Sequence, residues 1–341
     1  MKEIFFFSNF VFLNFGHPKR LVFQGLLVGF IWACGGFAAH AVSNSPLANG
    51  KLRLSLNWVP EPEFGGFYAA EQNGIFKQQG LDVEILPGGS TAPTIQMVAT
   101  GRTEYAIVSG DEVILAHDRG ATDVVALFAT YQTDPLAILA HAERNYQSLA
   151  DLFKDEKATL SWQSGSSYTQ FLAKKYGPLK IRIAPYLGGI GPFQKDPFLA
   201  QQGFMTSEPL LAEKAHLKVK LFLVADSGWR PYNTVLITSK KRLQGSPEEV
   251  RKFVEAVRAG WLDYLAHPEA VNRAMHQLNP SMDEATFKAS AELQKKYVEN
   301  EWTKKQGLGK MEKSRWQELI DQLLDLKIIK SKLKAEDLFV P

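Results

Sequence analysis

Short apolar strands alternate with helical stretches over the first two thirds of this 341-residue chain. In the first strand, residues 52–56, apolar and polar side chains alternate, and residues 64–79 have helical spacing that ends at Gly80. Strands and helices that alternate in this way form βαβ units around a largely parallel sheet. The sequence therefore predicts an α/β protein.

The alternation forms two runs. The first run continues with strands over residues 83–86, 105–108 and 124–128 and with helices over 91–100 and 112–119. The second run starts near residue 148, with strands over 158–160, 181–183, 204–205 and 218–224 and helices over 168–176 and 196–202. Two runs of βαβ units predict two sheets.

The chain after a last strand, residues 234–237, is wholly helical. Ser246 provides an N-cap, Pro247 a first-turn proline and Glu249 a capping-box carboxylate for a helix that reaches Ala266. Helices without a sheet of their own must pack on a sheet already present.

Two lobes follow from this organisation. Lobe one is predicted to comprise residues 42–140 and 233–341, and lobe two residues 141–232. Extended crossovers near residues 136–141 and 225–234 would leave a cleft between the lobes, where ligands bind at the carboxyl ends of strands.

The first 41 residues have the layout of a secretory signal peptide. Lys19 and Arg20 precede an apolar run over residues 21–37, which ends in an A-x-A pattern at Ala39 and Ala41. We expect cleavage after Ala41 and a periplasmic or other extracytoplasmic location. Two alternatives stay open, a lipid anchor at Cys34 after a lipoprotein-like box and an uncleaved membrane anchor.

Charge and cysteine content exclude some classes of partner and site. The 39 basic and 36 acidic residues leave a net charge of +3, too little to favour a nucleic-acid partner. Cys34 is the single cysteine, so the chain offers neither an internal disulfide nor Cys/His spacing for a zinc site. We expect no metal, no cofactor and a monomer.

Several motifs then suggest a family. They are Leu56-Asn57-Trp58-Val59-Pro60, Phe64-Gly65-Gly66-Phe67-Tyr68-Ala69-Ala70, Gly101-Arg102-Thr103-Glu104-Tyr105, and Gln202-Gly203-Phe204-Met205-Thr206-Ser207-Glu208-Pro209. Over residues 50–265 the chain resembles periplasmic substrate-binding proteins of ABC importers, in particular the thiamine-pyrimidine-precursor family and its nitrate, sulfonate and taurine relatives. The resemblance implies a two-lobed type II binding-protein fold and an ABC permease partner in the inner membrane.

Trp58 is the first candidate ligand contact. It follows strand 52–56, and Pro60 cannot continue the strand ladder, so the indole should emerge at the carboxyl end of the sheet. There it could stack on a flat ligand. The alternative is a core role, but the resemblance places this tryptophan in the cleft.

Hydroxyl groups gather at two predicted helix starts. Ser109 and Asp111 open a helix after a strand of lobe one, and Asp111 could instead act only as an N-cap. Ser164, Ser166 and Tyr168 hold the equivalent position in lobe two, where backbone and hydroxyl donors could reach a ligand.

Glu208 and Tyr232 complete the argued contacts. Glu208 lies in the matched motif and could accept hydrogen bonds from an aminopyrimidine, or could only stabilise a helix start. Tyr232 lies on the second crossover and could cover the ligand or simply pack. Asn57, Phe64 and Tyr131 are the other candidate ligand contacts.

The charges near the cleft favour a particular ligand class. The predicted cleft loops carry carboxylates, whereas Arg230 is the one base placed near them; the carboxylates are Glu61, Glu63, Asp111, Glu112 and Glu208. Such a site opposes an anion. We therefore expect a small heteroaromatic ligand, such as a thiamine pyrimidine precursor, with a sulfonate, nitrate or taurine ligand as the alternative.

An enzymatic function is the remaining alternative. One branch of the resembled superfamily synthesises the thiamine pyrimidine with an essential cysteine-rich iron motif, and this chain has no cysteine after Cys34. His117, His141 and His216 have no recognisable nucleophile partners. We expect a binding protein rather than an enzyme.

Overall fold

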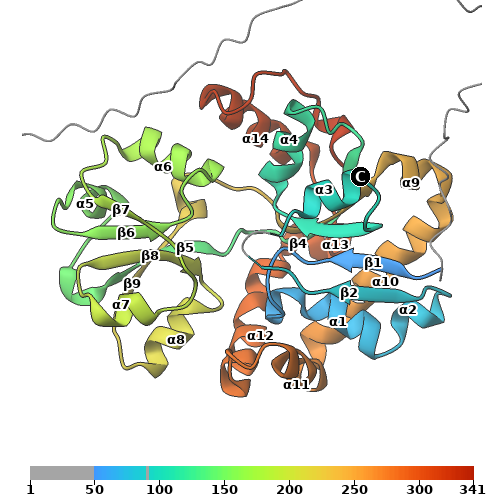
Figure 1. Ribbon diagram of the computed structural model, residues 1–341, viewed down its shortest axis with the longest axis horizontal. Coiled ribbons are helices and arrows are strands. Elements are labelled where there is room, and N and C mark those ends of the chain that lie inside the picture. The colour runs from blue at the N-terminus through green and yellow to red at the C-terminus, as the bar shows by residue number, and fades with distance from the viewer. Residues whose placement is uncertain (1–49, 90–91) are drawn as a thin grey trace, which may run out of the picture. The chain divides into compact units, whose positions relative to one another are not determined.

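The computed structural model describes residues 50–89 and 92–341, which contain two five-stranded sheets (Figure 1). The predicted signal peptide, residues 1–41, lies outside the described residues. The predicted α/β class with two sheets is confirmed.

Sheet A has the strand order β2-β1-β3-β10-β4. Its strands are β1 Leu52–Ser55, β2 Val83–Leu86, β3 Tyr105–Val108, β4 Val124–Tyr131 and β10 Asn233–Ser239. The first three are mutually parallel, and β10 runs antiparallel between β3 and β4. The last strand among the described residues thus lies inside this sheet, between β3 and the edge strand β4.

Sheet B has the strand order β7-β6-β8-β5-β9. Its strands are β5 Leu136–His141, β6 Thr159–Trp162, β7 Arg182–Pro185, β8 Leu199–Phe204 and β9 Val219–Leu223. Strand β6 pairs in parallel with β7 and β8, and β5 runs antiparallel to β8 and β9.

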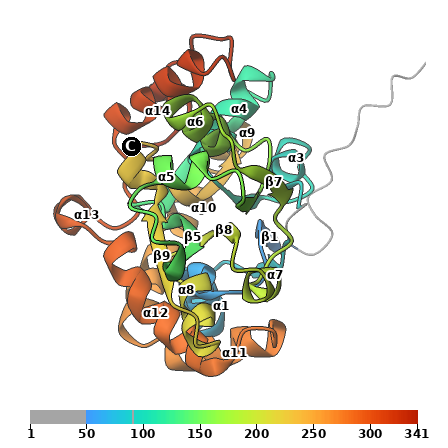
Figure 2. The ribbon, with the colours of Figure 1, turned by 90° about the vertical axis from the view of Figure 1, so that its left-hand side faces the viewer.

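The helices divide between the two sheets. Those in the chain segments of sheet A are η1 Pro62–Phe64, α1 Gly65–Gln72, α2 Ile75–Gln78, α3 Thr94–Ala99, α4 Gly110–Asp118, α9 Lys240–Gly245, α10 Pro247–Ala266, α11 Glu269–Leu278, α12 Glu284–Val298, α13 Glu301–Gln306, α14 Lys313–Asp325 and η4 Ala335–Asp337. Those in the segment of sheet B are η2 Ala142–Arg144, α5 Leu149–Lys154, α6 Ser167–Tyr176, α7 Gly191–Lys195, α8 Glu208–Lys214 and η3 Val224–Ser227. In Figure 2, α11 and α12 lie side by side at the lower end of the view, below α1. Among the described residues, no helix combines the length and hydrophobicity needed to cross a membrane.

Glycines let α1 and α10 approach closely. A Cβ atom on Gly66 would lie 2.2 Å from the Trp261 ring, and one on Gly260 would lie 2.3 Å from the Gly66 carbonyl oxygen. Trp261 is fully buried and packs edge-on against Phe67, with ring centroids 5.9 Å apart. The Phe64–Ala70 motif therefore has a packing role on α10.

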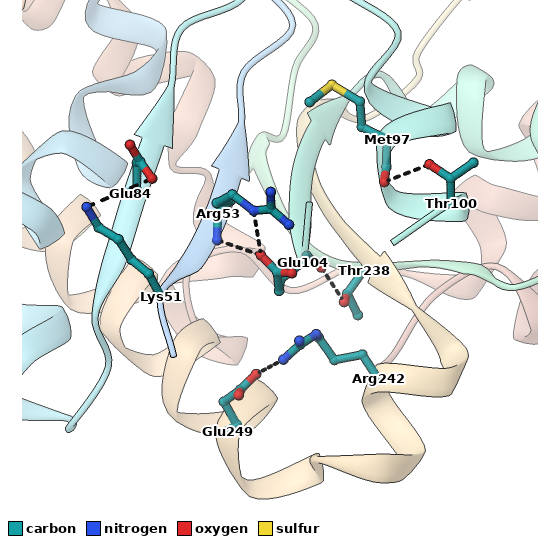
Figure 3. Close-up of polar contacts among 9 residues, drawn as sticks. All are labelled: Lys51, Arg53, Glu84, Met97, Thr100, Glu104, Thr238, Arg242 and Glu249. Carbon is teal, nitrogen blue, oxygen red and sulfur yellow. Dashed lines mark hydrogen bonds and ion pairs between the residues drawn. The ribbon is translucent and has the colours of Figure 1, made fainter. Parts of the chain in front are cut away.

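Glu104 ties β1, β3 and β10 together at the edge of sheet A where β1 and β3 begin (Figure 3). Its Oε2 accepts hydrogen bonds from the Arg53 backbone N–H at 2.8 Å and from Arg53 Nε at 3.4 Å. The Thr238 hydroxyl of β10 donates to the Glu104 carbonyl oxygen at 2.8 Å. The Gly101–Tyr105 motif thus stabilises the end of the sheet opposite to the carboxyl ends of β1 and β3.

Three predicted elements were wrong. The helix over 64–79 is interrupted between α1 and α2, because Gly74 has a φ of 71°. The helix over 196–202 is instead strand β8, whose buried Gln201 and Gln202 bond to other segments. The first crossover is shorter than expected, because residues 136–141 form β5 of sheet B.

Candidate ligand-binding cleft

A cleft of about 830 Å³ is lined by segments from both sheets. From sheet A it receives residues that follow β1 and β3, among them Trp58 and Ser109. From sheet B it receives residues that follow β6, β7 and β8, among them Gln163, Tyr186 and Glu208. These are the carboxyl ends of parallel strands, where open α/β sheets bind ligands.

Eight of the eleven predicted ligand contacts line this cleft. They are Asn57, Trp58, Ser109, Asp111, Ser164, Ser166, Tyr168 and Glu208. Trp58 is half-buried, so part of its indole is available to a ligand. The rule that residues after strand ends form the binding site selected these residues from the sequence.

The other three predicted contacts do not line the cleft. Phe64 is fully buried in the core. The Tyr131 hydroxyl donates to Gln294 Oε1 at 2.9 Å. Tyr232 packs under Arg315, whose guanidinium lies 3.8 Å from the ring centroid, and its hydroxyl accepts the Glu312 N–H at 2.8 Å.

Carboxylates dominate the charge of the cleft. Among the described lining residues there are six carboxylates, Glu61, Glu63, Asp111, Glu112, Asp134 and Glu208, and one guanidinium, Arg119. Arg230, the base expected near the site, is not among the lining residues, and its Nε donates to the Ala225 carbonyl oxygen at 3.3 Å. The cleft is therefore strongly acidic, as the sequence predicted.

Hydrogen bonds to its backbone hold the loop that carries Glu61 and Glu63. Asn279 Nδ2 donates to the Pro60 carbonyl oxygen at 3.0 Å, and Gln294 Nε2 donates to the Pro62 carbonyl oxygen at 3.0 Å. Pro60 and Pro62 also restrict the backbone. The backbone that carries the two carboxylates is thus anchored to the end of α11 and to α12.

The environment of these two groups favours their neutral forms. Burial, reinforced by the negative charge of Glu208, raises the pKa of Glu61 to about 8, although contact with the Trp58 side chain acts in the opposite direction. Burial and the neighbouring Glu61 raise the pKa of Glu63 well above its ordinary value. A ligand that brings donors or positive charge would relieve this penalty.

Glu208 is engaged by protein donors. The Tyr186 hydroxyl donates to Oε1 at 2.6 Å and the Phe204 N–H donates to Oε2 at 2.6 Å. A Cβ atom on Gly203 would lie 2.7 Å from Glu208 Oε2, so only glycine leaves room for the carboxylate there. Glu208 therefore has less free acceptor capacity than Glu61 and Glu63.

Asp134 joins the two crossovers. Its Oδ1 accepts the Leu136 N–H at 3.0 Å and Asn233 Nδ2 at 2.9 Å. Asp134 follows β4, and Asn233 begins β10. Burial raises the pKa of Asp134 to about 6, and these two hydrogen bonds oppose that rise.

Two ion pairs link helices of the two sheets. Lys214 of α8 pairs with Asp283 at the start of α12, and Lys174 Nζ of α6 lies 2.6 Å from Asp325 Oδ2 of α14. All four side chains are largely exposed, so each pair contributes little to stability.

Some residues that line the cleft were not expected from the sequence. Tyr186, Gln202, Asp134 and Asn233 all line the cleft. Tyr186 directly follows β7, so the strand-end rule used for Trp58 could have found it. Among the described residues, no group of three or more potential ligating side chains is arranged to hold a metal ion.

The chain matches one family model and several named proteins. The model, described as NMT1/THI5 like, matches residues 61–271. The riboflavin-binding protein RibY of Chloroflexus aurantiacus is 25% identical over 293 residues, 82% of each chain. The formylaminopyrimidine-binding protein of Halalkalibacterium halodurans is 24% identical over 310 residues, covering 84% of this chain and 89% of that protein.

An enzyme also matches. The 4-amino-5-hydroxymethyl-2-methylpyrimidine phosphate synthase THI11 of Saccharomyces cerevisiae is 24% identical over 299 residues, covering 77% of this chain and 84% of the synthase. The similar proteins thus include both binding proteins and synthases.

Among solved structures, the periplasmic aliphatic sulphonate binding protein SsuA of Escherichia coli superposes with a TM-score of 0.63. The match covers 86% of this chain and 92% of SsuA at 11% identity. The predicted periplasmic binding protein fold is confirmed.

Proposed function

Because the chain belongs to the NMT1/THI5-like family, we propose that it is an extracytoplasmic solute-binding protein of an ABC importer. Its ligand is a small, flat heteroaromatic compound that carries hydrogen-bond donors, such as a pyrimidine precursor of thiamine. It delivers this ligand to a permease in the inner membrane.

The acidic cleft carries this proposal. Six carboxyl groups and one guanidinium leave the cleft without the net positive charge that a simple anion requires, and the carboxyl oxygens favour a ligand edge rich in N–H or O–H donors. The half-buried Trp58 at the same cleft offers a face for stacking. The names of two similar proteins support the ligand class, since riboflavin and formylaminopyrimidine are both flat heteroaromatic compounds.

The alternatives have weaker support. A sulfonate or nitrate ligand fits the structural similarity to SsuA but not the carboxylates of this cleft. A synthase activity fits the similarity to THI11, but the iron motif that the resemblance implies needs cysteines, and none follows Cys34.

The binding mechanism is closure of two lobes. We assign residues 50–131 with 233–341 to one lobe and 136–232 to the other, with the first crossover at residues 132–135, because β5 belongs to sheet B and the boundary expected after residue 140 moves forward accordingly. A ligand that contacts both lobes favours the closed state by its differential affinity. Residues 1–41 direct export and are then removed, which sequencing of the mature N-terminus would test.

The ligand class is tested by calorimetry on the protein purified after export. The ligands are 4-amino-5-hydroxymethyl-2-methylpyrimidine, riboflavin, taurine and nitrate, and mass spectrometry identifies any compound that co-purifies. We expect binding of a heteroaromatic compound and none of nitrate. Tight binding of taurine or nitrate with no heteroaromatic binding would overturn the proposed ligand class.

Replacing Trp58 with alanine should weaken binding of the heteroaromatic ligand by roughly 1–3 kcal/mol, the range for base–aromatic stacking. Trp58→Phe keeps a ring and should retain most of the affinity. Trp302→Ala removes a half-buried tryptophan that does not line the cleft and serves as the matched control. Equal affinities for Trp58→Ala and wild type would exclude stacking at this position.

A further inference from the structure

Gln202 of β8 presents a side-chain hydrogen-bond donor to the cleft. The residue lines the cleft and is only 6% exposed. Its Oε1 accepts the Gln163 backbone N–H at 2.5 Å and the Tyr168 hydroxyl at 2.6 Å. In the part of the chain that the structure describes, no acceptor takes a hydrogen bond from Gln202 Nε2.

The two bonds to the oxygen fix the direction in which this amide faces. A backbone N–H can only donate, so the Gln202 atom beside the Gln163 nitrogen must be the amide oxygen, and Nε2 takes the other position. The Tyr168 ring is itself buried and packs edge-on against Trp162, with ring centroids 6.0 Å apart. The donor is therefore preorganised, and a ligand would not have to order it.

The other three amide side chains that line the cleft offer no such donor. Asn233 uses both ends of its amide, in hydrogen bonds to Asp134 and to the following backbone N–H. Gln163 has an exposed side chain, and Asn57 Oδ1 has no hydrogen-bond partner within the described ranges. Gln202 is thus distinguished by an amide whose oxygen is held by the protein and whose nitrogen is left for a ligand.

We propose that Gln202 Nε2 donates a hydrogen bond to an acceptor in the ring system of the ligand, either a ring nitrogen or a ring carbonyl oxygen. This rests on the proposed function and deepens it, because the ligand then needs a ring acceptor as well as donors for the carboxyl groups of the cleft. An aromatic hydrocarbon of the same shape would leave the amide without a partner. A site built to hydrogen-bond one group rejects an analogue that lacks it.

A matched pair of compounds tests the need for a ring acceptor. Calorimetry compares 4-amino-5-hydroxymethyl-2-methylpyrimidine with (2-amino-4-methylphenyl)methanol, which carries the same substituents on a benzene ring and lacks both ring nitrogens. At slightly alkaline pH both compounds are uncharged. We expect wild type to bind the pyrimidine about 10- to 30-fold more tightly than the benzene analogue.

Two variants locate this preference at Gln202. Gln202→Glu keeps an oxygen for the two protein donors but replaces the amide donor with an acceptor, and Gln202→Met removes the donor without adding charge. Each should lose most of the preference for the pyrimidine. A general distortion of the cleft would weaken both compounds alike, so the ratio of the two affinities is the readout. Gln78→Glu, at an exposed position of α2 outside the cleft, makes the same charge change and should keep the wild-type ratio.

The outcomes separate this proposal from the proposed function. Equal affinity of wild type for the two compounds, or a preference that survives in both variants, overturns the role of Gln202 and leaves the proposed function standing. If wild type binds riboflavin but not the pyrimidine, both variants must bind riboflavin at least about 10-fold more weakly than wild type, or the role of Gln202 is overturned. If wild type binds no heteroaromatic compound at all, the proposed function is overturned and the role of Gln202 falls with it.

Discussion

Replacing Glu61 with glutamine is expected to reduce the loss of stability that the unliganded protein undergoes between about pH 5 and pH 8. Burial beside Glu208 raises the pKa of Glu61 from an ordinary 4.5 to about 8 in the folded state. At a pH below the pKa of Glu61 in the unfolded chain, Glu61 is protonated in both the folded and the unfolded state. None of the stability is lost there. As the pH rises towards the folded pKa, the unfolded chain releases a proton that the folded chain retains, and stability falls.

The size of this effect follows from linkage. One proton held across about three pH units corresponds to about 4 kcal/mol, and partial solvation of the half-buried side chain reduces this to about 2–4 kcal/mol. Urea unfolding at a series of pH values measures it. Glu213→Gln, at an exposed position of α8, is the control and should retain the wild-type pH dependence. An unchanged slope in Glu61→Gln would show that Glu61 ionises normally.

Gly260→Ala is expected to destabilise the protein by about 3 kcal/mol, near the upper part of the range for overpacked cores. The added methyl group would lie 2.3 Å from the Gly66 carbonyl oxygen and 2.7 Å from the Ala70 Cβ. Because backbone cannot swing away as a flexible side chain does, α1 and α10 must separate, and buried Trp261 would lose contacts.

Gly245→Ala is the matched control for this prediction. A Cβ atom there meets nothing within 4 Å, and alanine is the better helix former, so this variant should be neutral or slightly stabilising. Urea unfolding compares the two. A similar free energy of unfolding for both variants would show that α1 and α10 can move apart without cost.

Local patterns in the sequence were sufficient for the fold class and for most of the cleft. Alternating strands and helices predicted both sheets, and the rule that ligands meet strand ends selected Trp58, Ser109 and Glu208. These residues, which line the cleft, could be selected because strand ends are visible in the sequence as apolar runs followed by proline, glycine or hydroxyl residues.

The missed features depend on tertiary contacts. The helix predicted over 196–202 is strand β8 instead, and its Gln201 and Gln202 side chains are buried because Gly189 and Tyr168 provide hydrogen-bond partners for them. Tyr232 was placed near the ligand, but Arg315, more than eighty residues later in the chain, covers its ring. Sequence spacing gives no indication of such distant partners.

The position of β10 has a consequence for biosynthesis. This strand begins at Asn233, yet it pairs with β3 and β4, which end at Val108 and Tyr131. Until the ribosome has made β10, both earlier strands keep an unpaired apolar edge, which is a template for aggregation. A chain that crosses a membrane from its N-terminus therefore cannot complete sheet A until most of its length has been translocated.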